Sequence, residues 1–222
     1  RKPKDAFKCE ELRGYLVIVV AAIVLITLNT WGMFPDLRTA VHHVAFQVAS
    51  IITTTGYSTV DFNQWPEFSK TLLLGIMFIG ACAGSTGGGI KVSRVLILLK
   101  SVKKELKQYL HPSAVEKIKM DGKIVEHEVV RSTNVFMVAY VLIFTVSVLL
   151  ISLDEYDLVT NFTAVTATFN NIGPGLALVG PTGNFGFFSN FSKVVLIFDM
   201  LAGRLEIFPV LLLFSRETWK RF

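Results

Sequence analysis

Charged residues are scarce in this sequence. They make up 18% of its 222 residues, hydrophobic residues make up 52%, and the mean hydropathy is +0.54. Because an ordinary water-soluble domain carries about 25% charged residues, this composition favours a membrane protein. The chain has two cysteines, Cys9 and Cys82, which excludes a disulfide framework and a cysteine-rich metal motif. We expect both to be structural thiols.

The sequence also lacks the residue patterns of several common functions. Its glycine-rich run does not match a phosphate-binding loop, because Ile90 separates the last glycine from Lys91. The same run does not match the nucleophile elbow of hydrolases, because Ala83 occupies the position of that motif's first glycine. No acid, base and nucleophile set gathers in the apolar runs, and no basic patch is interleaved with aromatic residues. We therefore expect neither an enzyme nor a nucleic-acid-binding protein.

The apolar residues are gathered in four long runs. Three of them contain no charged residue, and each has about the 20 residues that a helix needs to cross a membrane. These three are residues 15–33, 71–90 and 132–153. The fourth run, residues 194–214, is interrupted by Asp199, Arg204 and Glu206. The pattern predicts an all-α membrane protein.

The basic residues indicate how the chain is oriented. Lys and Arg cluster in three segments, whereas the two segments between them hold only Arg38 beside several acidic residues. The basic segments are residues 1–13, 91–131 and 216–221, and the other two are residues 34–67 and 154–190. Because short loops rich in Lys and Arg stay in the cytoplasm, we expect both ends of this chain to be cytoplasmic. The chain starts with Arg1 instead of Met, so we expect a fragment or mature piece of a longer chain.

The sequence repeats itself. Residues 68–70 and residues 191–193 share the sequence FSK, and when they are superposed Gly80 falls on Gly203 and both stretches continue as apolar helices. Each copy then has a span, an apolar outer segment and a second span, as expected when one structural unit is duplicated.

This repeat divides the chain into three parts. The first repeat with a cytoplasmic helical extension is residues 1–110, a cytoplasmic linker is residues 111–131, and the second repeat is residues 132–222. The linker contains Asp121 and Gly122 between alternating residues, which is typical of a β-hairpin. Two roles of the cytoplasmic part fit the sequence equally, namely binding of anionic lipid headgroups and docking of a regulatory partner.

Each outer segment predicts a short helix followed by a loop that contains glycine. Residues 36–52, which Pro35 and Asp36 open, suit a helix of about 25 Å, after which the chain must return to the same side of the membrane. In the second copy the helix covers residues 157–169. The loops that follow are residues 53–59, TTTGYST, and residues 170–175, NNIGPG. We therefore expect two re-entrant pore helices, each with a filter loop.

Extended backbone at membrane depth leaves carbonyl groups without a helical partner. Lipid excludes such groups unless they are buried in protein or line a water-filled path. Carbonyls that face a pore can replace the hydration shell of a cation, and glycine provides positive φ angles there. The C-terminal ends of the short helices add a negative field. The repeated loop therefore predicts a cation filter.

Four segments carry a family resemblance. They are residues 53–59, 80–91 and 170–175, and Gly203-Arg204-Leu205-Glu206. Together they resemble the Trk, Ktr and HKT superfamily of potassium transporters, most closely its bacterial TrkH branch, over nearly the whole chain. The resemblance implies four repeats around a pseudo-fourfold pore, of which this chain supplies the third and fourth, forming half of the ion pore. It also implies potassium uptake across the bacterial inner membrane, a homodimer among membrane lipids, and a cytoplasmic nucleotide-binding regulatory subunit of the TrkA type.

The resemblance further implies which residues bind the ion. The ion-binding filter residues are Thr54, Thr55, Gly56, Asn171, Ile172 and Gly173. Potassium is then the transported ion, and a nucleotide enters only through the regulatory partner. Two departures from the potassium-channel pattern leave selectivity against sodium open: no second glycine follows Tyr57, and Pro174 stands where the first loop has Tyr57.

A gate is expected below the filter. Four glycines between Gly84 and Gly89 should break the second span, because each costs about 0.8 to 1.0 kcal/mol relative to alanine in a helix. Close helix packing is the alternative reason for them. Arg204 lies about 16 Å from the outer edge of the membrane. It either forms an interhelical ion pair with a partner on another span or acts as an electrostatic barrier in the pore. With the resemblance, the gate residues are Gly84, Ser85, Thr86, Gly87, Gly88, Gly89 and Arg204.

Two other functions stay open on the sequence alone. A secondary transporter for another solute fits, because repeats and broken helices are common in that class. A non-conducting structural subunit of a membrane complex is the other. His42 and His43 lie near the outer end of the first short helix, and two adjacent histidines do not make a metal site, so we expect interfacial polar residues there.

Overall fold

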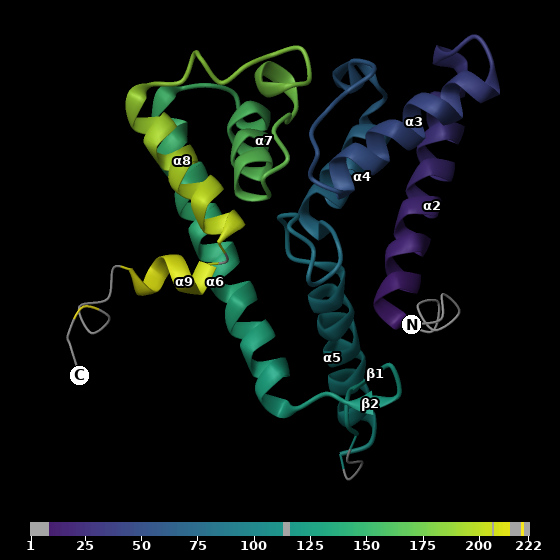
Figure 1. Cartoon of the computed structure of the whole chain (residues 1–222), viewed down its shortest axis with the longest axis vertical. Coiled ribbons are helices and arrows are strands. Elements are labelled where there is room, and N and C mark those ends of the chain that lie inside the picture. The colour runs from purple at the N-terminus through teal and green to yellow at the C-terminus, as the bar shows by residue number, and fades with distance from the viewer. Residues whose placement is uncertain (1–8, 113–115, 206, 214–218, 220–222) are drawn as a thin grey trace.

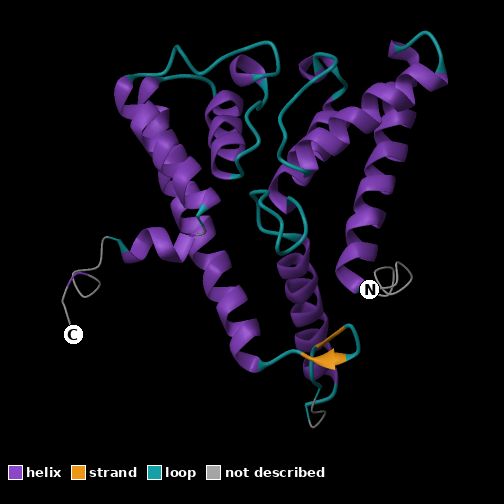
Figure 2. Ribbon diagram, viewed as in Figure 1, coloured by secondary structure: helices purple, strands orange, loops and turns teal. Residues whose placement is uncertain are grey.

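Helices form most of the computed structural model of this protein, which describes residues 9–112, 116–205, 207–213 and 219. They fall into two groups joined by a small hairpin (Figure 1, Figure 2). The first group is α2 (Glu10–Thr30), α3 (Leu37–Ile52), α4 (Glu67–Ile79) and α5 (Val92–Leu110). The second is α6 (His127–Ile151), α7 (Leu158–Phe169), α8 (Asn190–Arg204) and α9 (Ile207–Leu212). Short 3-10 turns occur at Trp31–Met33, Phe62–Gln64, Ser152–Asp154 and Ala177–Val179.

The hairpin expected in the linker is present between the two groups. Strands β1 (Lys119–Met120) and β2 (Lys123–Ile124) pair antiparallel. Asp121 and Gly122 form the turn with φ angles of 51° and 75°, and a type I′ turn requires two such positive angles. The hairpin lies beside α5, at the end of that helix away from the outer loops (Figure 2).

Two helical stretches in the described ranges are long and apolar enough to cross a membrane by length and composition. They are Glu10–Met33 and His127–Asp154. The expected second span is shorter, because α4 ends at Ile79 and Gly80 then takes a φ of 69°. The helix therefore breaks earlier than at Gly84, the position that the glycine content indicated.

The fourth apolar run is also not one continuous helix. It divides into α8, which ends at Arg204, and α9, which turns away from the axis of α8 (Figure 1). Glu206 and Phe214 lie outside the described residues. Of the charged residues that interrupt this run, Arg204 stands at the helix break, whereas Asp199 is buried within α8.

The molecule has two apolar cores, each mainly within one group of helices, although Ile172 also lies in the first core and Phe78 also packs against the second. In the first group, Ile26 of α2, Val48 of α3 and Leu73 of α4 are fully buried. In the second group, Phe169 of α7 and Leu196 of α8 are buried in the same way. The short helices α3 and α7 are thus held by the longer helices of their own group.

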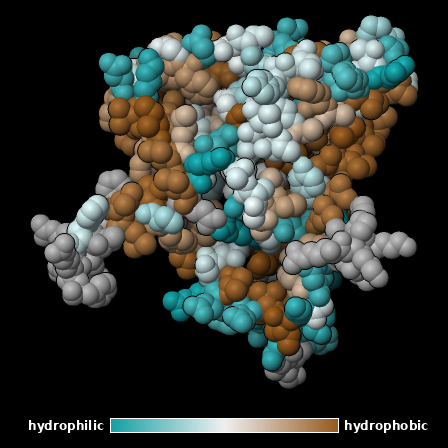
Figure 3. Space-filling model, in the orientation of Figure 1, coloured by the Kyte–Doolittle hydropathy of each residue, from teal (hydrophilic) through white to brown (hydrophobic). Residues whose placement is uncertain are grey.

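Apolar side chains also cover the outer flanks of the molecule. On the face shown in Figure 3, hydrophobic residues gather over both flanks, while hydrophilic residues lie along the centre and at the two ends. Val17 and Leu28 of α2 and Leu142 and Leu149 of α6 are each more than 60% exposed. Because soluble monomers rarely expose such extended apolar surface, the flanks suit contact with lipid or with other membrane helices.

The short helices α3 and α7 begin with the same capping contact. Asp36 accepts hydrogen bonds from the hydroxyl (2.6 Å) and the amide (3.1 Å) of Thr39, and Asp157 accepts the same two bonds from Thr160 at 2.6 and 2.9 Å. These bonds lower the pKa of both carboxyls, so each stays ionised at the positive end of its helix. From these caps both helices run toward the centre of the molecule (Figure 1).

Substitution of Gly203 tests this packing. A Cβ atom at Gly203 would lie 1.8 Å from the carbonyl oxygen of Phe169, whereas one at Gly75 would meet nothing within 4 Å. We expect Gly203→Ala to destabilise the complete protein by about 1 to 3 kcal/mol, as overpacking does. Gly75→Ala, the matched control in α4, should leave the melting temperature in detergent unchanged or slightly higher. Equal melting temperatures for the two variants would contradict the packing described.

Candidate functional site

Two loops follow the C-terminal ends of α3 and α7, and they lie against each other. We call residues 53–59 the first loop and residues 170–175 the second loop. A Cβ atom at Gly56 would lie 2.0 Å from the carbonyl oxygen of Ile172 and 3.2 Å from Cδ of Pro174. The two loops, far apart in sequence, can therefore touch only because residue 56 is glycine.

The amide groups of both loops turn back onto their own helices in the same way. In each loop two successive N–H groups donate to one carbonyl oxygen of the preceding helix, at 2.8 and 3.4 Å. The donors and acceptor are Thr55, Gly56 and Ser50 in the first loop, and Ile172, Gly173 and Ala167 in the second. The pattern is identical in the two copies, which is physical support for the internal repeat.

The carbonyl groups of these loops must point the other way. In a planar trans peptide the C=O of one residue is antiparallel to the N–H of the next. The carbonyls of Thr54 and Thr55, and those of Asn171 and Ile172, therefore face away from their helices. Among the described residues, no hydrogen bond to these four oxygens is found. A cavity of about 650 Å³ opens beside them, between both loops and α8.

The backbone angles that aim these carbonyls include two that the sequence did not indicate. Gly56 and Gly173 have φ angles of 81° and 108°, as the sequence predicted for loop glycines. Thr54 and Asn171 also adopt positive φ, 55° in each case. Positive φ is rare for non-glycine residues and unfavourable for a β-branched one, and such strain concentrates at functional sites.

Side chains of α3 hold the last residues of the first loop. The hydroxyl of Ser50 donates to the carbonyl of Tyr57 at 2.6 Å, and the amide of Thr59 donates to Oε1 of Gln47 at 3.2 Å. His43 Nδ1 lies 3.0 Å from Oγ1 of Thr59. In the ranges described, no group of three His, Cys, Asp or Glu residues could hold a metal ion. His43 thus has a structural contact with the end of the first loop.

The second loop is held from α6 and from the first repeat. The hydroxyl of Tyr140 donates to Oδ1 of Asn170 at 2.8 Å, and Asn170 is fully buried at the end of α7. The side chain of Asn63 makes two hydrogen bonds of 2.9 Å with the backbone of Ala177, accepting from its N–H and donating to its C=O. Gly180 permits this approach, because a Cβ there would lie 2.9 Å from Nδ2 of Asn63.

These supporting residues were missed by sequence reasoning. Asn63 is an ordinary polar residue of an outer segment, and nothing in the sequence around it indicates a contact. Its partner is the backbone of Ala177, and a backbone partner leaves no pattern in the sequence. Tyr140 lies within an apolar run, where a single tyrosine gives no indication of its contact. Such contacts are set by tertiary packing and become visible only in the structure.

Residues 80–91, which we call the glycine loop, lie directly against the first and second loops. Its Gly88 amide donates to Oγ1 of Thr54 at 3.4 Å, and a Cβ atom at Gly88 would be 2.1 Å from the carbonyl oxygen of Asn170. Its end is fastened to α4, since Ile90 N–H donates to the carbonyl of Phe78 at 3.0 Å. The run of glycines therefore allows a backbone segment to lie in contact with the first and second loops.

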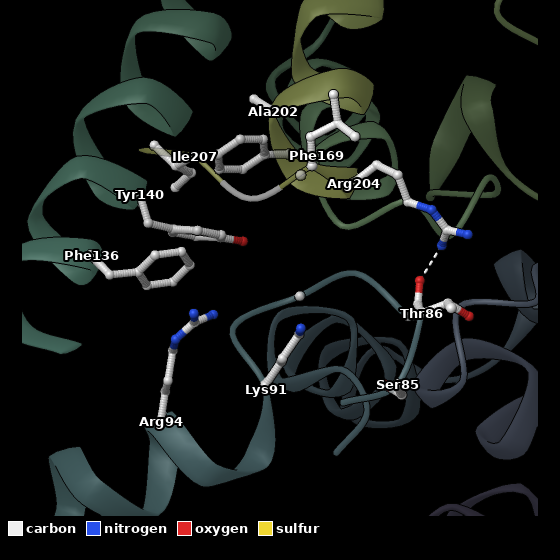
Figure 4. A pocket seen from close by; sticks show the side chains of 14 residues that line it. Ser85, Thr86, Lys91, Arg94, Phe136, Tyr140, Phe169, Ala202, Arg204 and Ile207 are labelled. Atoms are coloured by element: carbon white, nitrogen blue, oxygen red, sulfur yellow. Dashed lines mark hydrogen bonds between the residues drawn. The ribbon is translucent and has the colours of Figure 1, made fainter. Parts of the chain in front are cut away.

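Arg204 reaches the glycine loop from α8. Its Nη1 donates to the carbonyl of Thr86 (Figure 4). Thr86 belongs to the apolar run of residues 71–90, in the part that is not helical, so the partner from this run is a backbone carbonyl and not a charged side chain. A cavity of about 200 Å³ lies beside this contact and is also lined by Lys91 and Arg94. The Arg94 guanidinium carbon lies 4.0 Å from the ring centroid of Phe136. The cavity wall is thus strongly basic among the described residues.

Comparison with known proteins identifies the family. The TrkH family, described as cation transport proteins, matches residues 15–221. The chain belongs to the TrkH family. A similar relative is the Trk system potassium uptake protein TrkH of Salmonella typhimurium, 39% identical over 99% of this chain and 46% of the relative. Another is the Trk system potassium uptake protein TrkG of Escherichia coli, 37% identical over 95% of this chain and 43% of the relative.

A solved TrkH structure has the same fold as this chain. The crystal structure of the potassium transporter TrkH from Vibrio parahaemolyticus matches with a TM-score of 0.90 at 40% identity, covering 98% of this chain and 47% of that one. This TrkH-family chain therefore spans about half the length of the relatives it matches. The family is one of transporters, which confirms the expectation that the chain is not an enzyme.

Proposed function

We propose that the complete protein containing this chain takes up potassium through a transmembrane pore that the first and second loops help to line. The observation that carries the proposal is a set of four carbonyls that have no hydrogen-bond donor among the described residues, in two touching loops that each follow a short helix. Similar proteins from Salmonella typhimurium and Escherichia coli are named potassium uptake proteins, which supports potassium as the ion.

The filter consists of Thr54, Thr55 and Gly56 together with Asn171, Ile172 and Gly173. Carbonyl oxygens of both loops take the place of water around the ion, as in other carbonyl filters. The C-terminal, negative ends of α3 and α7 precede the two loops and add a field that favours a cation. Residues 1–110 and 132–222 form two re-entrant quarters of a pseudo-fourfold pore, and the half that this chain does not include completes the ring.

The gate consists of residues 84–89 and Arg204. The glycine loop lies in contact with the filter, and the bond from Arg204 to the carbonyl of Thr86 holds it across the conduction path. The fixed positive charge of Arg204 opposes cation entry at the same level. Conduction therefore needs this loop to move and the guanidinium to leave its carbonyl partner.

The surroundings of this pore follow from the family resemblance and stay predictions. They are a bacterial inner membrane with both ends of this chain cytoplasmic, a homodimer, contact with membrane lipids, and a nucleotide-binding regulatory subunit of the TrkA type. The hairpin of the linker, residues 111–131, offers an exposed cytoplasmic element on which such a subunit can dock.

A secondary transporter for another solute is the main alternative, and a non-conducting subunit is a second. Helices α4 and α8 both break within their apolar runs. Broken helices are also common in secondary transporters, so this feature does not separate such a transporter from a pore. Flux of potassium, rubidium and sodium into liposomes containing the complete protein separates these functions. A pore gives electrically driven flux of the monovalent cations, whereas a transporter for another solute gives none without that solute.

Substitution of Gly56 tests the filter. We expect Gly56→Ala to reduce potassium flux about tenfold or more, because a side chain at φ +81° is strained and its Cβ would be 2.0 Å from the carbonyl oxygen of Ile172. Gly32→Ala is the matched control, because a Cβ there meets nothing within 4 Å and its flux should equal that of the wild type. Normal flux and selectivity in folded Gly56→Ala protein would refute the filter assignment.

Substitution of Arg204 tests the gate. We expect Arg204→Ala to raise potassium flux severalfold, because it removes both the charge and the bond to Thr86, whereas Arg204→Lys keeps the charge and should stay closer to the wild type. The measurement is radioactive rubidium uptake into liposomes with equal amounts of folded protein. Unchanged or lower flux in Arg204→Ala would argue against a barrier.

A further inference from the structure

Helix α2 begins with two consecutive glutamates that bind different parts of the molecule. Oε1 of Glu11 accepts hydrogen bonds from the amide of Ala83, at 2.6 Å, and from the amide of Ser93, at 3.2 Å. Ala83 is in the glycine loop and Ser93 is in the first turn of α5. One carboxylate oxygen therefore joins the glycine loop to the helix that follows it.

The contact with Ser93 supplies a cap that α5 lacks. Its own N-cap residue, Lys91, makes no side-chain capping bond and has a φ of 77°. The first amides of a helix need acceptors, and a negative charge at that end is favourable. Glu11 of α2 provides the acceptor and the negative charge for the start of α5. Because the same oxygen also binds Ala83, the position of the glycine loop depends on how α2 is placed relative to α5.

Glu11 and Arg204 hold the glycine loop by opposite groups. Glu11 binds an N–H of the loop, and Arg204 binds the carbonyl of Thr86 three residues further on. Hydrogen bonds in which one partner is charged are the stronger kind. Between Ala83 and Thr86 the loop is therefore fastened on one side to α2 and on the other to α8.

Glu10 fastens the same end of α2 to the cytoplasmic hairpin. Its Oε1 accepts from the amide of Asp121 at 3.2 Å, and its own amide donates to Oδ1 of Asp121 at 2.6 Å. Its Oε2 pairs with Nζ of Lys100 on α5, and the same Nζ donates to the carbonyl of Lys119 at 2.6 Å. Because consecutive helical residues point about 100° apart, Glu10 and Glu11 can bind the hairpin and the glycine loop at the same time.

We infer that Glu11 is a positioning residue that keeps the gate closed by binding the glycine loop. We also infer that this contact depends on the hairpin, because Glu10 fixes the start of α2 to it. A cytoplasmic partner that displaces the hairpin moves the start of α2, and with it the carboxylate that holds Ala83. The inference rests on the proposed function and adds a route by which the gate is regulated. It needs no change in the filter itself.

Native Cys82, next to Ala83, reports on this contact. It is a free, partly buried thiol close to the charge of Glu11. Because the thiolate is the reacting form, the rate constant with a cationic methanethiosulfonate added from the cytoplasmic side is divided by the thiolate fraction, taken from the pH dependence of the rate in each variant. The corrected rate measures how far the loop is released. The assay uses the complete protein in membranes, with Cys9 and all other cysteines replaced by serine. We expect Glu11→Ala to raise the rate about tenfold, the change expected when a charge-assisted hydrogen bond is lost.

Two further variants separate positioning from general damage. Glu11→Gln keeps an acceptor oxygen and should raise the rate less than Glu11→Ala. Glu105→Ala removes a negative charge from an exposed site on α5 and should leave the rate unchanged. Equal rates in the wild type, Glu11→Ala and Glu11→Gln would overturn the inference.

A separate variant tests the link between Glu10 and the hairpin. Asp121→Gly removes the carboxylate that binds Glu10 but leaves a Gly-Gly turn, which still suits a type I′ hairpin. It should raise the Cys82 rate in otherwise unchanged protein and add little in Glu11→Ala, because both act through the same contact. Full additivity of the two variants, or no effect of Asp121→Gly, would contradict the link to the hairpin.

Rubidium flux measured on the same proteins distinguishes the inference from the proposed function. Increased flux in Glu11→Ala supports both. If the wild type conducts and Arg204→Ala raises flux while Glu11→Ala alters neither flux nor Cys82 reactivity, the inference fails and the pore stands. If Cys82 reactivity changes as expected but no variant conducts a cation, the contact stands and the proposed function fails.

Discussion

The structure depends on one constraint, namely that peptide oxygens within a membrane need a partner. After α3 and α7 the backbone leaves the helix, and two successive amides in each loop bind back to one helical carbonyl. The planar peptide then forces the carbonyls of the first and second loops to the opposite side, where no donor within the described residues meets them. Lipid cannot satisfy them, so a polar path must. In the function we propose, a dehydrated cation is that partner.

The rest of the molecule holds these oxygens in place. Ser50 and Gln47 fix the last residues of the first loop, and Tyr140 fixes the end of α7. Asn63 joins the outer segments of the two repeats. Below them the glycine loop fits only because residue 88 has no side chain. In the function we propose, the filter and the gate are therefore in direct contact, so a movement of the glycine loop changes the surroundings of the filter directly.

The sequence predicted the elements well and the contacts poorly. The first short helix was expected because Pro35 and Asp36 open an apolar periodic stretch, and the second because the outer segment recurs in the second copy. The loop glycines were expected because positive φ needs them. The positive φ of Thr54 could not be predicted, since its type disfavours that conformation and only the surrounding bonds impose it. The sequence placed the partner of Arg204 on another apolar run but could not show that it is the backbone carbonyl of Thr86, because periodicity does not reveal which backbone groups lack a helical partner.

The most direct test of this account is to locate ions in crystals of the complete protein grown with rubidium. Anomalous scattering would show where the ion lies. The account predicts peaks within coordination distance of the carbonyls of Thr54, Thr55, Asn171 and Ile172. Rubidium peaks found only elsewhere, with these four carbonyls bound to protein donors, would contradict it.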